Sequence, residues 1–184
     1  MRLRNPLNPA WLVVIDPQAI FADPSSPWAA PRFNAAMAVI ASIAPRFDDR
    51  VVVTRWLPAQ PHRGSWRAYF ERWPFADRPI TDPLFDLVPA AANLSRFATV
   101  DAPTFGKWGR RMRDMLGPTP NLVLTGCSTD CCVMSTALAA ADCGATVRVV
   151  SDGCAGSSPE NHEAALQLMR LYEPQITVLP ASQL

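Results

Sequence analysis

Short runs of consecutive apolar residues recur along the chain, and stretches with helical spacing follow most of them. The runs are WLVVID (11–16), RVVVTRW (50–56), RFATV (96–100), NLVLTG (121–126), TVRVVSD (146–152) and QITVLP (175–180). Uninterrupted apolar runs are typical of parallel strands that are buried on both faces. Strands that alternate with helices predict an α/β fold, in which helices cover both faces of a mostly parallel, doubly wound sheet.

Helices are predicted from apolar spacing and from the residues that begin or end it. We expect them at residues 33–43, with Ser26 as a cap, at 66–72, at 107–117 ending at Gly117, at 129–144 ending at Gly144, and at 158–172 capped by Ser158. The whole chain, 1–184, is expected to form one three-layer α/β/α domain. Residues of about 57–93, rich in Pro, Trp and Arg, are expected to form an excursion from it.

Charge and hydropathy exclude several classes of partner. The net charge of +1 gives no electrostatic reason to expect nucleic acid or an anionic membrane, and no apolar run could span a bilayer. The N-terminal segment carries Arg2 and Arg4 but no small-residue cleavage site, so we do not interpret it as a leader. We expect a cytoplasmic protein whose five cysteines do not form a disulfide framework.

Three of those cysteines lie in the stretch GCSTDCCV, and four interpretations compete for them. A zinc site is disfavoured because the cysteines lack the Cys-x-x-Cys spacing and no second pair of ligands follows them. A disulfide between the adjacent Cys131 and Cys132 would be strained. The cysteines could also be small buried apolar residues. Alternatively, Thr129 and Asp130 cap a helix whose first turn holds Cys132. There the positive end of the helix would lower the pKa of the thiol and favour a nucleophilic thiolate.

Lysine usage singles out one further residue. Of the 17 basic residues of the Lys and Arg types, Lys107 is the only lysine. Codon bias toward Arg explains the arginines but not why one lysine remains. Lysine can lose its proton and acts as a compact charge, which arginine cannot do. Asp16, Lys107 and the turn at 126–132 all follow predicted strands, so their side chains can meet at one edge of the sheet.

These motifs resemble those of the isochorismatase-like cysteine hydrolases, which include nicotinamidases and N-carbamoylsarcosine amidohydrolases. GCSTDCCV resembles the family signature Gly-x-x-Thr-Asp-x-Cys-Val, LVVIDPQ resembles its first strand with Asp-x-Gln, and SDGCAGSSPENHEAAL resembles its later strand and helix. The resemblance implies Cys132 as nucleophile, Asp16 as general base and Lys107 as the cation beside the thiolate. It further implies an oxyanion hole from the backbone N–H groups of Ser128 and Cys132, and a cis peptide bond after Cys127.

The resemblance implies hydrolysis of a C–N bond in a small amide or N-carbamoyl compound through a thioester-type intermediate. No Asp-x-His follows the second strand and His62 stands alone there, which argues against a metal-dependent nicotinamidase, so we expect neither a metal nor another cofactor. His162 is expected on a solvated helical face. Relatives are commonly homodimers or homotetramers, and the same is expected here.

Aromatic residues near the predicted strand ends are candidates for the wall of a substrate pocket. Phe21, Trp56, Trp108 and Cys127 are expected to touch a small planar substrate, and the alternative for the three aromatic residues is that they belong to the core or to a dimer interface. The aromatic residues of the excursion are expected to pack against the body or a partner subunit; they are Trp66, Tyr69 and Trp73. Two rival functions stay open: a catalytically idle relative that binds a metabolite or partner, and a redox role for Cys131 with Cys132.

Overall fold

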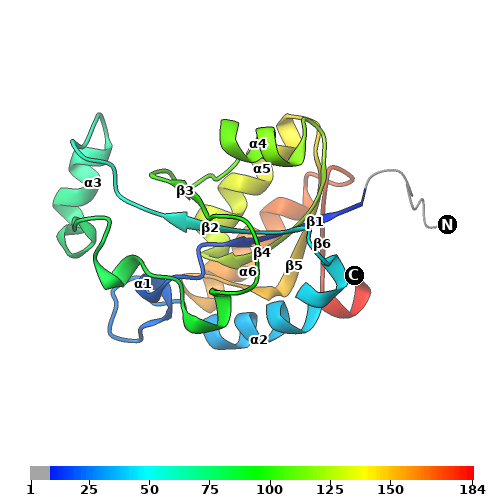
Figure 1. Ribbon diagram of the computed structural model, residues 1–184, viewed down its shortest axis with the longest axis horizontal. Coiled ribbons are helices and arrows are strands. Elements are labelled where there is room, and N and C mark those ends of the chain that lie inside the picture. The colour runs from blue at the N-terminus through cyan, green and yellow to red at the C-terminus, as the bar shows by residue number, and fades with distance from the viewer. Residues whose placement is uncertain (1–8) are drawn as a thin grey trace.

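The computed structural model describes residues 9–184, and its centre is a six-stranded sheet (Figure 1). The strands are β1 (Trp11–Ile15), β2 (Val51–Trp56), β3 (Val100–Ala102), β4 (Asn121–Cys127), β5 (Thr146–Ala155) and β6 (Ile176–Leu179). They lie in the order β3-β2-β1-β4-β5-β6, and every neighbouring pair is parallel. The predicted doubly wound α/β fold is confirmed. Arg2 and Arg4, which bear on the question of a leader, lie outside the described residues.

Six α-helices connect and flank the strands of residues 9–184. They are α1 (Ala19–Ala22), α2 (Phe33–Ile43), α3 (Trp66–Arg72), α4 (Arg110–Leu116), α5 (Met134–Asp142) and α6 (Pro159–Arg170). Short 3₁₀ turns occupy Ala44–Phe47, Pro74–Ala76, Pro83–Phe85, Pro89–Ala91 and Ala181–Gln183, and a π-helical turn spans Thr129–Val133. Within the described part of the chain no helix has the length and apolar content that a membrane crossing requires.

Several predicted boundaries are confirmed and others are wrong. Ser158 caps α6 by accepting a hydrogen bond from the Asn161 N–H, and Gly117 ends α4 with φ of 89°. Ser26 does not cap α2; its hydroxyl accepts from the Trp28 N–H in a separate turn. The segment at 107–109 is loop because α4 begins only at Arg110, and the third strand lies at 100–102, beyond most of the apolar run that predicted it.

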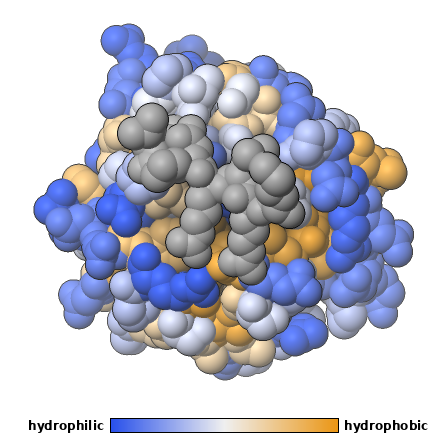
Figure 2. Space-filling model, turned by 90° about the vertical axis from the view of Figure 1, so that its right-hand side faces the viewer, coloured by the Kyte–Doolittle hydropathy of each residue, from blue (hydrophilic) through white to orange (hydrophobic). Residues whose placement is uncertain are grey.

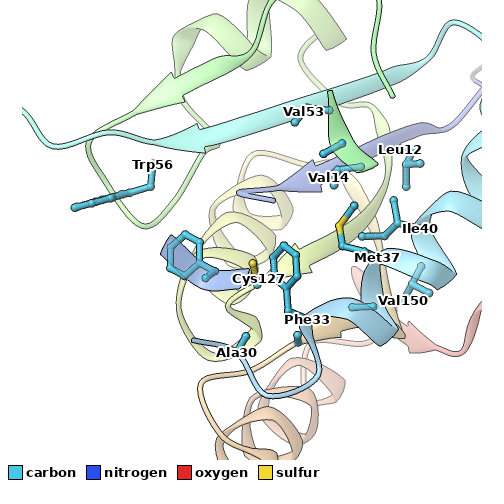
Figure 3. Packing of buried hydrophobic residues seen from close by; sticks show 14 of the residues in the cluster. Leu12, Val14, Ala30, Phe33, Met37, Ile40, Val53, Trp56, Cys127 and Val150 are labelled. Atoms are coloured by element: carbon cyan, nitrogen blue, oxygen red, sulfur yellow. The ribbon is translucent and has the colours of Figure 1, made fainter. Parts of the chain in front are cut away.

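Alternation along β1 divides the core into two layers. Leu12 and Val14 pack with α2, whereas Val13 and Ile15 pack with α4, α5 and α6 on the other face. Figure 1 shows α2 on the side of the sheet opposite to α4 and α5. Figure 3 shows Phe33, Met37 and Ile40 of α2 pointing at the sheet, as their helical spacing predicts. Both faces of the sheet are thus covered, which explains the continuous apolar runs of its strands.

The strand order creates a topological switch point between β1 and β4. In doubly wound sheets of this order the crevice at that point, beyond the carboxyl ends of the strands, is where ligands bind. Asp16 directly follows β1, and the π-helical turn follows β4 by one residue. The excursion with α3 lies beyond the same edge (Figure 1, left). The opposite end of the molecule has hydrophilic residues around much of its rim, with hydrophobic ones between them (Figure 2).

Gly126 brings β1 and β4 close together at this point. Its φ is +105°, and a Cβ built there would lie 2.1 Å from the carbonyl oxygen of Ile15. Ile15 and Gly126 are partners in the β1–β4 register. A side chain at position 126 would therefore force β1 away from β4 immediately before Asp16.

Replacing Gly126 with Ala is expected to lower the free energy of unfolding by about 3–5 kcal/mol, because backbone strain adds to a steric overlap with main chain. Gly109→Ala is the matched control, since Gly109 has φ of −100° and no heavy atom lies within 4 Å of the place that its added methyl group would take. Urea unfolding followed by circular dichroism measures both variants. Equal stability of the two variants would contradict the close approach at Gly126.

Candidate functional site

Asp16 lies at the carboxyl end of β1 and is completely buried. Its φ is 48°, a conformation that is uncommon for a residue with a side chain and is kept where surrounding contacts fix it. Thr54 of β2 supplies two such contacts. Its hydroxyl accepts from the Asp16 N–H at 3.1 Å and donates to Asp16 Oδ1 at 2.6 Å. The carboxylate is therefore held in one orientation at the switch point.

Lys107 reaches Asp16 from the loop between β3 and α4. Its Nζ lies 3.0 Å from Asp16 Oδ2, and neither side chain is exposed to solvent. The ammonium also donates to the carbonyl oxygen of Thr104 at 2.7 Å. Burying two charges is costly unless they pair and find further hydrogen-bond partners, and here both groups do. The single lysine of the chain thus forms a buried ion pair with Asp16.

Cys132 lies in the π-helical turn that follows β4 and is 3% exposed. The Asp16 carboxylate lies close enough to its thiol to raise the pKa of that thiol. Thr136 ties this turn to the lysine loop: its hydroxyl accepts from the Lys107 N–H at 2.9 Å and donates to the Cys132 carbonyl oxygen at 2.6 Å. Asp16, Lys107 and Cys132, which are far apart in sequence, are therefore brought together.

The pKa of the Cys132 thiol is raised well above its ordinary value, against our expectation from its place at a helix start. Burial is the largest cause, and the charge of Asp16 acts in the same direction. The charge of Lys107 lowers the pKa but does not outweigh them. Desolvation and a nearby anion therefore exceed the effect of the helix end. The resting thiol keeps its proton and has a carboxylate beside it that can accept one.

The peptide bond between Cys127 and Ser128 is cis, as the family resemblance implies. The Ser128 carbonyl oxygen accepts from the N–H groups of Cys131 and Val133 and so fixes the turn. Ser128 and Cys132 both line the cavity described below. Their backbone N–H groups are thus carried by the residues that face a bound ligand.

Thr129 and Asp130 do not cap the turn, contrary to the prediction. No side-chain cap bond is present at this helix start. The Thr129 hydroxyl instead bonds His162 Nδ1 at 2.8 Å, and the Asp130 carboxylate accepts from the N–H and the hydroxyl of Ser157 at 2.8 and 2.7 Å. Both side chains tie the turn to the chain segment around the start of α6.

Cys127 does not face the cavity, so its predicted contact with substrate is wrong. It is buried with the α2 layer beside Phe33 (Figure 3), and its thiol donates to the Asp16 carbonyl oxygen at 3.2 Å. Cys131 is half-buried and does line the cavity. Burial and the neighbouring Asp130 raise the pKa of Cys131 to about 11.

A cavity of about 380 Å³ opens above Cys132. Six aromatic side chains line it: Phe21, Trp28, Trp56, Tyr69, Trp73 and Phe105. The other lining residues are Pro27, Ser128, Asp130, Cys131, Cys132 and Ser157. Phe21 and Trp56 were predicted at such a wall. A wider and shallower hollow of about 630 Å³ between Phe97 and α4 contains none of the candidate catalytic residues.

Trp108 was also predicted at the pocket wall, and the structure contradicts this. Although Trp108 is adjacent to Lys107, its side chain packs into the core layer with Met112 of α4. Phe105, on the other side of Lys107, lines the cavity instead. The loop conformation, which the sequence does not reveal, decides which of the two aromatic rings faces the ligand.

Sequence reasoning missed Trp28, the centre of the aromatic wall. Its ring contacts those of five aromatic residues, with centroid separations between 5.0 and 6.2 Å: Phe21, Trp56, Tyr69, Trp73 and Phe75. Tyr69 and Trp73 were expected to pack against the body or a partner; they pack on Trp28 and line the cavity. The signal available was a tryptophan in a proline-rich loop, SSPWAAP, soon after the strand that carries Asp16.

Gln18 positions Trp56. The fully buried Gln18 amide donates to the carbonyl oxygens of Trp56 and Phe85 at 3.0 and 2.8 Å and accepts from the Trp56 N–H at 2.7 Å. The Asp-x-Gln pattern therefore has two separate roles here: its Asp faces the thiol, and its Gln joins β1 to the end of β2.

Neither histidine lies in the cavity wall. His62 stacks on Phe70 and pairs with Asp77 at 2.9 Å in the excursion. His162 is buried and not solvated as expected, and burial lowers its pKa. Among residues 9–184, no three His, Cys, Asp or Glu side chains are grouped so that they could hold a metal ion.

Comparisons with known proteins agree with this architecture. A family model described as Isochorismatase domain matches residues 10–180. An isochorismatase family protein from Desulfovibrio vulgaris is similar with a TM-score of 0.78 at 20% identity, covering 95% of each chain. A cysteine hydrolase from Pseudomonas syringae is similar with a TM-score of 0.78 at 17% sequence identity, and the match covers 95% of this chain and 89% of that one. A pyrazinamidase/nicotinamidase from Streptococcus mutans is similar with a TM-score of 0.71 at 22% sequence identity, and the match covers 92% of this chain and 99% of that one. A search of curated proteins finds no match.

Asp16→Asn is expected to lower the pKa of the Cys132 thiol, because it removes a negative charge that disfavours the thiolate. Alkylation of Cys132 by iodoacetamide, read by peptide mapping against pH, should then reach half its maximal rate at a lower pH than in the unsubstituted protein. The exposed Cys143 serves as the internal control, with the same profile in both proteins. An unchanged or higher midpoint for Cys132 would contradict the contact with Asp16.

Proposed function

The chain belongs to the isochorismatase family, and we propose that it is a cysteine hydrolase that cleaves the C–N bond of a small amide or N-carbamoyl compound. One observation carries the proposal: a thiol in a cavity wall lies beside a carboxylate that is itself paired with a buried lysine. One solved neighbour is named a cysteine hydrolase and another a pyrazinamidase/nicotinamidase, which supports a thiol nucleophile and an amide substrate.

The first half of the proposed reaction forms a covalent intermediate. Asp16 takes the proton of the Cys132 thiol as the sulfur attacks the carbonyl carbon. The charge of Lys107, which favours the ionised thiol, stabilises the sulfur as it becomes negative. Asp16 then gives the proton to the nitrogen, the C–N bond breaks, and ammonia or an amine leaves a thioester on Cys132.

The developing oxyanion requires donors that are already in place. We assign this role to the backbone N–H groups of Ser128 and Cys132, two cavity-lining residues of the turn. The Ser128 carbonyl holds this turn through the N–H groups of Cys131 and Val133, so its geometry is fixed before substrate binds. Fixed donors of this kind stabilise the tetrahedral intermediate without reorganisation.

The second half of the reaction regenerates the thiol. Asp16 removes a proton from a water molecule, whose oxygen attacks the thioester carbonyl. The carbon–sulfur bond breaks, the carboxylic or carbamic acid leaves, and the sulfur recovers the proton from Asp16. The same carboxylate thus serves as base and acid in both halves, which its fixed position between Thr54, Lys107 and Cys132 allows.

The idle-relative alternative was motivated by the unusual sequence position of Lys107. Lys107 Nζ nevertheless lies 3.0 Å from Asp16 Oδ2, so its sequence position no longer favours that alternative. We further propose that the enzyme needs no cofactor, acts in the cytoplasm and assembles as a homodimer or homotetramer. The excursion, with the exposed Ile80, offers a surface for assembly. Sedimentation velocity measures the oligomeric state directly.

Cys132→Ala is expected to abolish ammonia release from whichever compound in a panel of small amides and N-carbamoyl compounds the unsubstituted protein hydrolyses. The loss should exceed about 10³-fold, because the nucleophile itself is removed. Cys143→Ala is the matched control, since Cys143 is an exposed thiol outside the cavity. Retained turnover by Cys132→Ala would reject the mechanism. Tight binding without turnover in the unsubstituted protein would favour the idle relative.

The rate of hydrolysis, kcat/KM, is expected to be nearly flat between about pH 7 and 9. The raised pKa keeps the Cys132 thiol protonated in this range, and Asp16 removes the proton only during attack. Attack by a pre-ionised minor thiolate would instead increase kcat/KM about tenfold per pH unit below the thiol pKa. Initial rates of ammonia release in a buffer series of constant ionic strength distinguish these two behaviours.

A further inference from the structure

We propose that the cavity selects amides whose far end carries a positive charge, such as a quaternary or methylated ammonium group. This inference rests on the proposed function, because it names the substrate class for the same site. Its basis is the combination of an aromatic wall with one fixed carboxylate and no cationic side chain among the described residues that line it.

The ionised side chains that line the cavity have one sign, although the Arg72 guanidinium carbon lies 5.6 Å from the ring centroid of Trp73 without lining the cavity itself. Asp130 is the only ionisable side chain other than thiols and a phenol among its lining residues, and no Arg, Lys or His lines it in the part of the chain that the structure describes. Lys107 lies below the floor and is paired with Asp16. The cavity wall thus contains none of the arginines in which the chain is rich. An anionic substrate would meet repulsion without a compensating cation.

Asp130 is held in place at this wall. Both of its oxygens accept hydrogen bonds from Ser157, one from the N–H and one from the hydroxyl, and the Ser157 hydroxyl also accepts from the Asn161 amide. Two basic groups lie near this side: His162, whose pKa is lowered by burial and by the charge of Arg32, and Arg32 itself. Neither lines the cavity. The carboxylate is therefore fixed at the wall with no cationic partner among the described residues that line the cavity.

The aromatic wall supplies the second element of cation recognition. The ring pairs around Trp28 and Tyr69 meet mostly at steep angles: 72° for Trp28 with Trp56, 69° for Trp28 with Trp73 and 74° for Tyr69 with Phe105. Rings at such angles surround a volume instead of forming one flat surface. Boxes of aromatic rings bind quaternary ammonium groups through the negative faces of the rings.

The same arrangement favours departure of the product. Hydrolysis converts a neutral amide into a carboxylate, and that carboxylate forms beside Asp16 and within a cavity that holds Asp130. Asp130 repels it at the end of the reaction, whereas the charge of Asp16 is compensated by Lys107. A cationic far end binds the substrate before cleavage, when the amide end is still neutral.

The test compares two probes of nearly the same shape, carbamoylmethyl-trimethylammonium and its uncharged carbon counterpart, 3,3-dimethylbutanamide. Binding to the Cys132→Ala protein is read from the fluorescence of the tryptophans that line the cavity, without turnover. We expect the cation to bind about tenfold more tightly, which is the range of cation–π attraction joined to one nearby carboxylate. Protection of Cys132 against iodoacetamide in the unsubstituted protein gives the same ratio independently of that variant.

Asp130→Asn should reduce the ratio of the two affinities by at least about threefold, while Asp114→Asn, which removes an exposed charge on α4, should leave the ratio unchanged. Equal affinities for the two probes, tighter binding of the neutral one, or no binding of either would overturn the proposal. A ratio that persists in Asp130→Asn would overturn the role of Asp130. If the cation is preferred but no amide is ever hydrolysed, the charge selection stands and the proposed hydrolase function fails.

Discussion

The buried ion pair between Asp16 and Lys107 is the constraint on which the site depends. Burying two opposite charges is costly unless they pair and find hydrogen-bond partners, and Thr54 bonds Asp16 while Thr104 bonds Lys107. Removing either partner of such a pair typically costs about 3–5 kcal/mol, because an unpaired charge is left in the interior. The pair therefore fixes the carboxyl end of β1 against the lysine loop, and Thr136 extends this connection to the turn that carries Cys132.

Burial and the two members of the pair together set the state of the proposed nucleophile. A helix start alone would favour a thiolate, but burial and the carboxylate beside it raise the pKa of Cys132 and keep it as a thiol. In the proposed mechanism Asp16 is consequently part of the attacking step and not merely a neighbour of a pre-formed thiolate. This arrangement explains how a reactive sulfur can lie at the floor of an aromatic cavity and yet remain protonated until a substrate binds.

Much of the fold could be predicted from the sequence because strong local signals carried it. Apolar runs marked the strands, with β3 the weakest and least accurately placed, and Gly117 and Ser158 marked helix boundaries correctly. The residues of the proposed triad could be named because Lys107 is the single lysine, Asp16 and Cys132 follow predicted strands, and the motifs around them resemble those of the isochorismatase-like cysteine hydrolases, which implies their roles. The contacts among these three residues could not be predicted, because the contacts depend on hydrogen bonds through the side chains of Thr54 and Thr136. The aromatic wall was largely missed because irregular loops, whose paths have no periodic pattern, carry Trp28, Trp73 and Phe105.

The central claim, that Cys132 attacks the substrate with Asp16 as its base, is tested most directly by acid quenching during turnover followed by peptide mass mapping. With an amide that the enzyme hydrolyses, the account predicts that the peptide containing Cys132 gains the mass of the acyl group. Hydroxylamine should remove that group, and fragmentation should place it on Cys132 and not on the adjacent Cys131. Turnover with an unmodified Cys132 at every quench time, or an acyl group on Cys131, would contradict the account.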